Sequence, residues 1–199
     1  MKWTALPPDI RSGNARDLFE KLGFLAASRV IHDSINAPLV VFDPGAFEAI
    51  LDHLRAGPGE LGGLLLGRAY SLPYDTIHGY AFLTVVSGAV PSREFTNTEF
   101  SLKMGTELWS SASDALNKGS LVIGWYHSHP SLGAFFSTID RATQKAFFNH
   151  PYSLGVVIDP VRGEQKCFAG PDCNEIDVKW PPDLDNRVPI HIIRNIRSV

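Results

Sequence analysis

A short segment in the second half of the chain gathers three side chains that could bind a metal ion. The segment Trp125-Tyr126-His127-Ser128-His129-Pro130 is followed by Ser137 and then by Asp140. On an extended backbone His127 and His129 point to the same side, because they stand two residues apart. Asp140, carried in from the start of the next element, can complete a face of three ligands. Three protein ligands, with a fourth position left to water, characterise a catalytic zinc site rather than a closed structural one.

Such a site suits the hydrolysis of amide bonds. Amides resist hydrolysis because water is a poor nucleophile, the carbonyl is weakly electrophilic and the leaving amine must be protonated. Zinc addresses the first two obstacles, since it lowers the pKa of water and polarises carbonyl groups. A general base within hydrogen-bond reach must then take a proton from the water and return one to the amine. The sequence therefore has to supply a carboxylate or a similar base from another part of the chain.

The segment resembles the signature of the JAMM (MPN+) metallopeptidases, in which a Glu well upstream is followed by H-[ST]-H-P, a spacer and S-x-x-D. The upstream element is present as well, because Glu60, Gly63 and Gly67 stand in the register of the family's E-x-x-G-x-L-x-G. The resemblance covers roughly residues 38–170, and neither motif departs from the family pattern. This argues against the family's inactive branch, whose members keep the fold and lose the ligands.

The resemblance implies a role for each candidate residue. His127, His129 and Asp140 would hold one Zn²⁺ per chain, and Glu60 would be the general base. Judged alone, Glu60 would be a solvated carboxylate after a Gly-Pro-Gly turn. Ser137 would donate a hydrogen bond to the developing oxyanion or position the water. A helix N-cap is a competing role for Ser137, and the two roles are compatible.

The resemblance also implies an activity and a substrate. The protein would be a zinc-dependent protease or isopeptidase that cuts the peptide or isopeptide bond after the C-terminal Gly of a ubiquitin-like protein. The substrate would be that protein or its conjugate, and an E1/E2-like conjugation system is a candidate partner. We expect the sheet edge beside the metal to hold the substrate tail as an added strand, flanked by residues 92–99. The alternative is a non-catalytic MPN-type interaction or scaffold module that retains its metal ligands.

In its small, single-domain form the chain resembles bacterial members of the family that are encoded with ubiquitin-like conjugation or antiphage systems. The order of apolar runs and breaks predicts a mixed α/β fold. The resemblance implies a curved β-sheet flanked by helices, the cytidine-deaminase-like JAMM/MPN fold. We expect strands near residues 39–42, 61–70, 77–87, 121–126, 154–158 and 165–169, and helices near 15–32, 44–55, 98–117 and 138–149.

These elements would position the site. The strand at 121–126 delivers the two histidines, and a helix capped by Ser137 or Thr138 carries Asp140 in its first turn. Residues 188–196 are apolar and ambiguous between strand and helix. We divide the chain into an N-terminal helical extension (residues 1–37), a JAMM/MPN+ catalytic domain (38–170) and a C-terminal extension that packs on the domain (171–199).

Composition limits the remaining possibilities. The 199 residues are 44% hydrophobic and 20% charged, which suits one globular domain with extensions. A net charge of −3 gives no electrostatic case for a nucleic-acid or anionic-membrane partner.

Pro7, Pro8 and Asp9 interrupt any signal-peptide core at the N-terminus. Cys167 and Cys173 indicate a reducing compartment rather than a disulfide framework, although a redox pair or a second metal site stays open. We expect a cytoplasmic protein.

Overall fold

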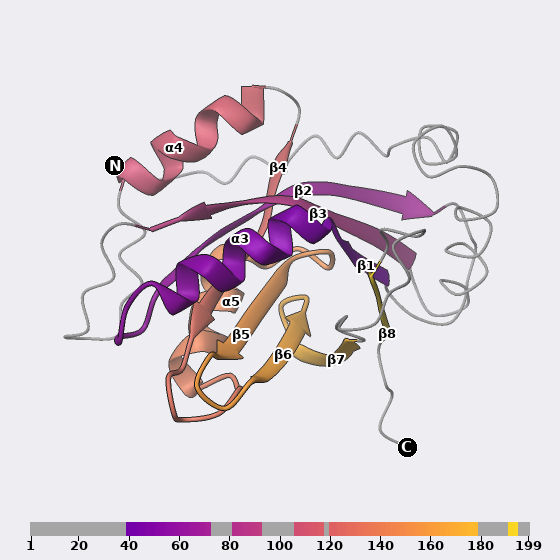
Figure 1. Ribbon diagram of the computed structural model, residues 1–199. Coiled ribbons are helices and arrows are strands. Elements are labelled where there is room, and N and C mark those ends of the chain that lie inside the picture. Colours follow the sequence, from indigo (N-terminus) through magenta and orange to yellow (C-terminus); the bar gives the residue numbers. More distant parts are fainter. Residues whose placement is uncertain (1–38, 73–80, 93–105, 118–119, 179–190, 195–199) are drawn as a thin grey trace, which may run out of the picture.

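A computed structural model describes residues 39–72, 81–92, 106–117, 120–178 and 191–194, which form a curved β-sheet with helices packed against it (Figure 1). The mixed α/β fold with a curved sheet flanked by helices is confirmed. The expected helix at 15–32 lies outside the described residues. In chain order the elements are β1 (Leu39–Phe42), α3 (Pro44–Arg55), β2 (Gly62–Leu72), β3 (Ala81–Pro91), α4 (Thr106–Asn117), β4 (Leu121–Ser128), α5 (Thr138–Phe147), β5 (Leu154–Asp159), β6 (Glu164–Ala169), β7 (Asn174–Val178) and β8 (His191–Arg194).

The sheet closes on itself. Its strand order is β1-β3-β2-β4-β5-β6-β7-β8, and β8 pairs with β1. The β1–β3 and β4–β5 pairs are parallel, and the other neighbours are antiparallel. Strand β4, which carries His127, has β2 on one side and β5 on the other. Strand β4 therefore has no free edge, and the edge expected to hold the substrate tail beside the metal is not that of β4. Residues 93–99 of the expected flanking loop lie outside the described residues.

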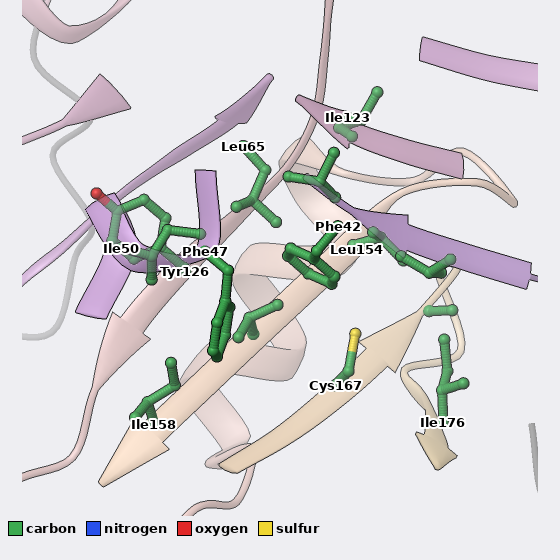
Figure 2. Close-up of a cluster of buried hydrophobic side chains, with 14 of the residues drawn as sticks. Phe42, Phe47, Ile50, Leu65, Ile123, Tyr126, Leu154, Ile158, Cys167 and Ile176 are labelled. Atoms are coloured by element: carbon green, nitrogen blue, oxygen red, sulfur yellow. The ribbon is translucent and has the colours of Figure 1, made fainter. Parts of the chain in front are cut away.

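One face of the sheet packs against α3. The helix expected at 44–55 is present, and Asp43 caps it, because its carboxylate accepts hydrogen bonds from the backbone N–H groups of Gly45 and Ala46. Figure 2 shows the buried cluster to which this helix and strands β1, β2, β4, β5, β6 and β7 contribute side chains. The residues labelled there are Phe42, Phe47, Ile50, Leu65, Ile123, Tyr126, Leu154, Ile158, Cys167 and Ile176.

A second cluster of buried side chains includes residues of α4 and residues on either side of α5. Side chains of β4 divide between the clusters, with Tyr126 in the first and Trp125 in the second. His127 lies on the same side of β4 as Trp125, since the two residues are two apart. The other members of the second cluster are Leu64, Leu66, Leu108, Ala112, Ala134, Phe136, Phe148, Val157, Phe168 and Cys173. Both cysteines are free and buried.

Gly63 and Gly67, the two glycines in register with the family motif, let β2 approach its neighbours closely. A Cβ atom at Gly63 would overlap the carbonyl oxygen of Val90, and one at Gly67 would overlap the carbonyl oxygen of Val85. A side chain at either position would therefore push β2 away from β3. Because Glu60 stands just before β2, this packing also determines where Glu60 enters the sheet.

Element boundaries differ from the sequence predictions at several places. Strand β3 spans 81–91, and residues 77–80 of the strand expected at 77–87 lie outside the described residues. The described part of the expected helix at 98–117 begins at 106. Residues after 170 contribute β7, which the sequence did not predict, and β8, which lies in the segment that was ambiguous between strand and helix. None of the helices in the described ranges is long and apolar enough to cross a membrane.

Candidate metal centre

Three of the predicted site residues lie together. Ligand atoms of His127, His129 and Asp140 are all within 4.8 Å of one another, and all three residues are buried. The Nε2 atoms of the two histidines are 3.0 Å apart. From Asp140, Oδ1 lies 3.3 Å from His127 Nε2 and Oδ2 lies 3.7 Å from His129 Nε2. Among the described residues this is the one group of at least three His, Cys, Asp or Glu side chains with such spacing.

Local structure explains why the ligand atoms converge. His127 is placed by β4, and the backbone N–H of His129 donates to the carbonyl of Ile158 at 3.0 Å, which extends the pairing with β5. Asp140 is in the first turn of α5, as predicted, and Ser137 is the N-cap residue. The Ser137 hydroxyl accepts from the Asp140 N–H at 3.2 Å, and Asp140 Oδ2 accepts from the Ser137 N–H at 2.7 Å. This capping box turns the carboxylate back toward the imidazoles.

The spacing of the three ligand atoms fits a metal ion of the size of Zn²⁺. Tetrahedral zinc with bonds of about 2.0–2.2 Å to nitrogen and oxygen separates its ligand atoms by roughly 3.3–3.5 Å. The two imidazole nitrogens are 3.0 Å apart, and each lies 3.3 or 3.7 Å from one of the two carboxylate oxygens of Asp140, so the separations lie at or near this range. Two imidazole nitrogens and one carboxylate oxygen also form a donor set that zinc accepts. The cluster therefore has the spacing and the donor set that a metal ion needs.

The protonation states of the cluster also favour the binding of a cation. Burial raises the pKa of Asp140, but hydrogen bonds with His127 and Ser137 outweigh burial and hold this pKa below its ordinary value. Burial, and then the neighbouring His127, lower the pKa of His129. An ionised carboxylate and a neutral imidazole are the forms that bind metals.

Glu60 lies beside this cluster. It is half-buried just before β2, where Gly62 pairs with His127 across the sheet. Burial raises the pKa of Glu60, His127 lowers it and the negative charge of Asp140 raises it further, with a net upward shift. Glu60 is therefore within electrostatic range of two of the three candidate ligands. A titratable side chain with a perturbed pKa beside a metal-capable cluster is a candidate for acid–base chemistry.

Ser128, which the sequence analysis did not single out, links Glu60 to the histidine strand. Its hydroxyl accepts from the N–H of Leu61 at 3.0 Å, and its own N–H donates to the Leu61 carbonyl at 2.8 Å. The side chain is fully buried and lies between the two histidines in the chain. Its place inside the H-S-H-P motif was the only available signal.

Asp159, which the sequence analysis did not single out, holds the loop that follows His129. Its buried carboxylate accepts from the N–H groups of Ser131 at 3.0 Å and Gly133 at 2.8 Å. It also accepts hydrogen bonds from the backbone N–H groups of Val161 and Arg162, in the turn that follows β5. Burial raises the pKa of Asp159, but these backbone hydrogen bonds lower it to about 2. A buried Asp at the end of an apolar strand could have suggested this role from sequence.

The fold and this site are those of the JAB/MPN class, and the comparison of sequences agrees. The family described as prokaryotic homologues of the JAB domain (Prok-JAB) matches residues 43–167, and the chain belongs to this family. The JAMM/MPN family predicted from the two motifs is thereby confirmed.

The relatives of this chain include proteins that are named for different activities. Ubiquitin carboxyl-terminal hydrolase RPN11 of Saccharomyces cerevisiae is 36% identical over 115 residues, which cover 57% of this chain and 36% of the relative. NAD(+) hydrolase TcpA of a Theionarchaea archaeon is 33% identical over 110 residues, covering 55% of this chain and 30% of the relative. The crystal structure of a JAB1/MPN domain protein from Archaeoglobus fulgidus matches 68% of this chain and 94% of that chain, with 18% identity and a TM-score of 0.42. The chain spans about a third of the length of the curated relatives it matches.

Proposed function

We propose that the protein is a zinc-dependent protease or isopeptidase that hydrolyses the peptide or isopeptide bond after the C-terminal Gly of a ubiquitin-like protein. The observation that carries the proposal is the convergence of His127, His129 and Asp140 at metal-ligand spacing, beside Glu60 with its raised pKa. The substrate class is supported by a relative whose name is ubiquitin carboxyl-terminal hydrolase.

Each residue has a distinct task in this proposal. His127, His129 and Asp140 would hold the zinc, which would polarise the scissile carbonyl group. Glu60 takes a proton from the attacking water and later gives it to the leaving amine. Its raised pKa suits this role, because the carboxylate is then a stronger base toward the water. The carboxylic acid so formed is still acidic enough to protonate the leaving amine. The hydroxyl of Ser137 accepts from the Asp140 N–H, and in the reaction its own hydrogen would be donated to the developing oxyanion.

Metal content and turnover test the proposal together. The purified protein should carry about one zinc per chain, as a three-ligand catalytic site does. His129→Ala and Asp140→Ala should each lose most of the metal by elemental analysis. A linear fusion of a ubiquitin-like domain with a Gly-terminated tail should be cleaved after that Gly, chelation should stop cleavage, and added Zn²⁺ should restore it. Full zinc without turnover of such fusions would favour an interaction module.

Two further variants separate the catalytic residues from the ligands. Glu60→Gln keeps the shape of the side chain but cannot take a proton, and loss of a general base costs about 10²–10⁴-fold in kcat. Ser137→Ala removes one oxyanion donor, a loss on the order of 10²–10³ in kcat with little change in KM. Both variants should keep their zinc. Glu60→Gln turning over close to the wild-type rate, or losing its metal, means that the general base is another residue.

The Ser137 variant needs a control, because Ser137 is also a helix cap. Replacing an N-cap residue by Ala costs about 1 kcal/mol of stability. Asp43→Ala removes the cap of α3 and touches none of the candidate site residues, so it reproduces the loss of stability alone. Its kcat should equal that of the wild type. If Asp43→Ala slows turnover as much as Ser137→Ala does, the effect of Ser137 is one of stability.

A further inference from the structure

We propose that Trp125 and Gln144 form a clamp that positions the metal-binding residues. In this clamp Trp125 orients the imidazole of His127, and Gln144 fixes the helix that carries Asp140 relative to β4. The inference rests on the proposed function only in taking His127 and Asp140 as metal ligands.

The first half of the clamp is a ring stack. The indole of Trp125 and the imidazole of His127 lie face to face, with ring centroids 4.5 Å apart and an angle of 5° between the planes. His127 Nδ1 is buried and has no hydrogen-bond partner among the described residues. In most metal sites that second nitrogen donates to a carboxylate or a carbonyl, and this bond sets the orientation of the ring. Here the flat contact with the indole takes over that task.

The second half is a hydrogen bond between the strand and the helix. Trp125 Nε1 donates to Gln144 Oε1 at 2.7 Å, and both side chains are fully buried. Gln144 is four residues after Asp140, so the two side chains lie on the same face of α5. The amide nitrogen of Gln144 reaches three backbone carbonyls that lie C-terminal to it, those of Phe148, Ser153 and Gly170, at 3.3–3.4 Å.

These contacts join the two parts of the ligand set. His127 comes from β4 and Asp140 from α5, two elements that are joined by a loop. The bond from Trp125 to Gln144 crosses from one element to the other beside the ligands. The surroundings are tight as well, because a Cβ at Gly155 would overlap the Phe136 ring and lie 3.0 Å from Gln144 Oε1. Trp125 and Gln144 thus act on the metal through its ligands, as positioning residues.

Two variants test the clamp by metal affinity, a measurement that needs no substrate. Trp125→Phe keeps an aromatic ring but removes the indole N–H, and Gln144→Met keeps the volume but removes both amide functions. Competition with a chelator should give a zinc affinity about 10–100-fold weaker in each variant, the usual effect of losing an outer-shell partner. The visible absorption of the Co²⁺-substituted protein should also change, since this absorption reports ligand geometry.

Thr84→Val is the matched control. It removes another buried side-chain hydrogen bond, from Thr84 Oγ1 to the Tyr152 carbonyl at 3.2 Å, away from the ligands. Its Tm should fall while its zinc affinity and Co²⁺ spectrum stay those of the wild type. Trp125→Phe and Gln144→Met behaving in the same way would overturn the clamp.

Three further outcomes distinguish a variant that fails to fold, a stack that does not form and a proposed function that is wrong. If Gln144→Met does not fold, Trp125→Phe decides the matter, because it leaves the bonds from Gln144 to the backbone in place. In wild-type protein labelled with 5-fluorotryptophan, the ¹⁹F resonance of Trp125 should shift when zinc binds, and an unchanged resonance counts against the stack. Weakened zinc binding in the variants of a protein that cleaves no ubiquitin-like fusion would support the clamp and reject the isopeptidase.

Discussion

At the scale of single residues, the carboxylate of Asp140 serves two purposes at once. Its Oδ2 accepts from the N–H of Ser137 at 2.7 Å, as in any capping box, and its Oδ1 faces His127 at 3.3 Å. The helix cap therefore orients the carboxylate before a metal arrives, so little rotamer freedom is lost on binding. The S-x-x-D motif can be understood as a helix start whose third residue is also a ligand.

Ser128 is the residue whose replacement should separate positioning from ligand binding. Ser128→Ala leaves the N–H of Leu61 without its acceptor, so the segment that carries Glu60 loses one attachment to β4. Because a small displacement of a catalytic group costs up to about 10²-fold, we expect kcat to fall roughly 10–100-fold with KM and zinc content unchanged. Steady-state kinetics with elemental analysis check this.

Ser128→Thr is the control for that variant. It keeps the hydroxyl group, and Thr is allowed at this position of the family motif. Its kcat should remain near that of the wild type. Equal losses in the Ala and Thr variants would show that packing around residue 128, rather than the bond to Leu61, is what matters.

At the scale of elements, the sequence predicted those pieces whose signals are local. The helix capped by Asp43 and the helix capped by Ser137 followed from side chains that bond their own first turn. The buried strands β2, β4 and β5 followed from apolar runs. Strand β7 was missed, because it is short and follows a stretch with Pro171 and a positive φ at Cys173.

Pairing between distant elements could not be predicted in this way. The closure of the sheet through β8 and β1 depends on contacts between the two ends of the described chain. The roles of Gln144 and Asp159 depend on which backbone groups the fold brings to them. The ligands themselves were identified because their spacing is local, whereas the side chains that support them become recognisable only in three dimensions.

Replacing Asp159 should destabilise the loop between β4 and α5 in a way that depends on pH. Asp159→Asn turns an amide N–H toward backbone donors, and a lost hydrogen bond to a buried charge costs about 1.5–3 kcal/mol of unfolding free energy at neutral pH. The pKa of Asp159 falls from 3.8 to about 2 on folding. A carboxylate with a lowered pKa stabilises the fold above its ordinary pKa, and the stabilisation disappears as the pH falls toward the folded value. The gap between wild type and variant should therefore narrow between about pH 4 and pH 2.

Urea unfolding of the metal-free proteins at several pH values measures this gap. Glu175→Gln is the control, because it makes the same change to an exposed carboxylate that pairs with Lys166 at 2.8 Å. An exposed ion pair contributes about 0–1 kcal/mol, so this variant should differ little from the wild type. A gap for Asp159→Asn that stays constant on acidification would contradict the assigned pKa.

At the scale of the whole molecule, the barrel does not depend on a metal for its core. Two clusters of buried apolar side chains hold the sheet, one including α3 and the other including α4. The metal-capable residues lie at the end of β4 and the start of α5. Folding brings these residues together, so a cation would meet a site that is already formed.

This arrangement predicts that the metal-free protein stays folded and that zinc adds stability to it. At a free zinc concentration about 1,000 times the Kd, binding adds about 4.1 kcal/mol to the free energy of unfolding. For a chain of this length, that corresponds to a rise in Tm of roughly 8–16 °C. Scanning calorimetry of chelator-treated and zinc-loaded protein gives the shift, and His129→Ala should fold but show almost none of it. A small zinc-dependent domain unfolds when its metal is removed. Loss of the cooperative transition after chelation would therefore mean that the zinc holds the barrel together, and the centre would be structural rather than catalytic.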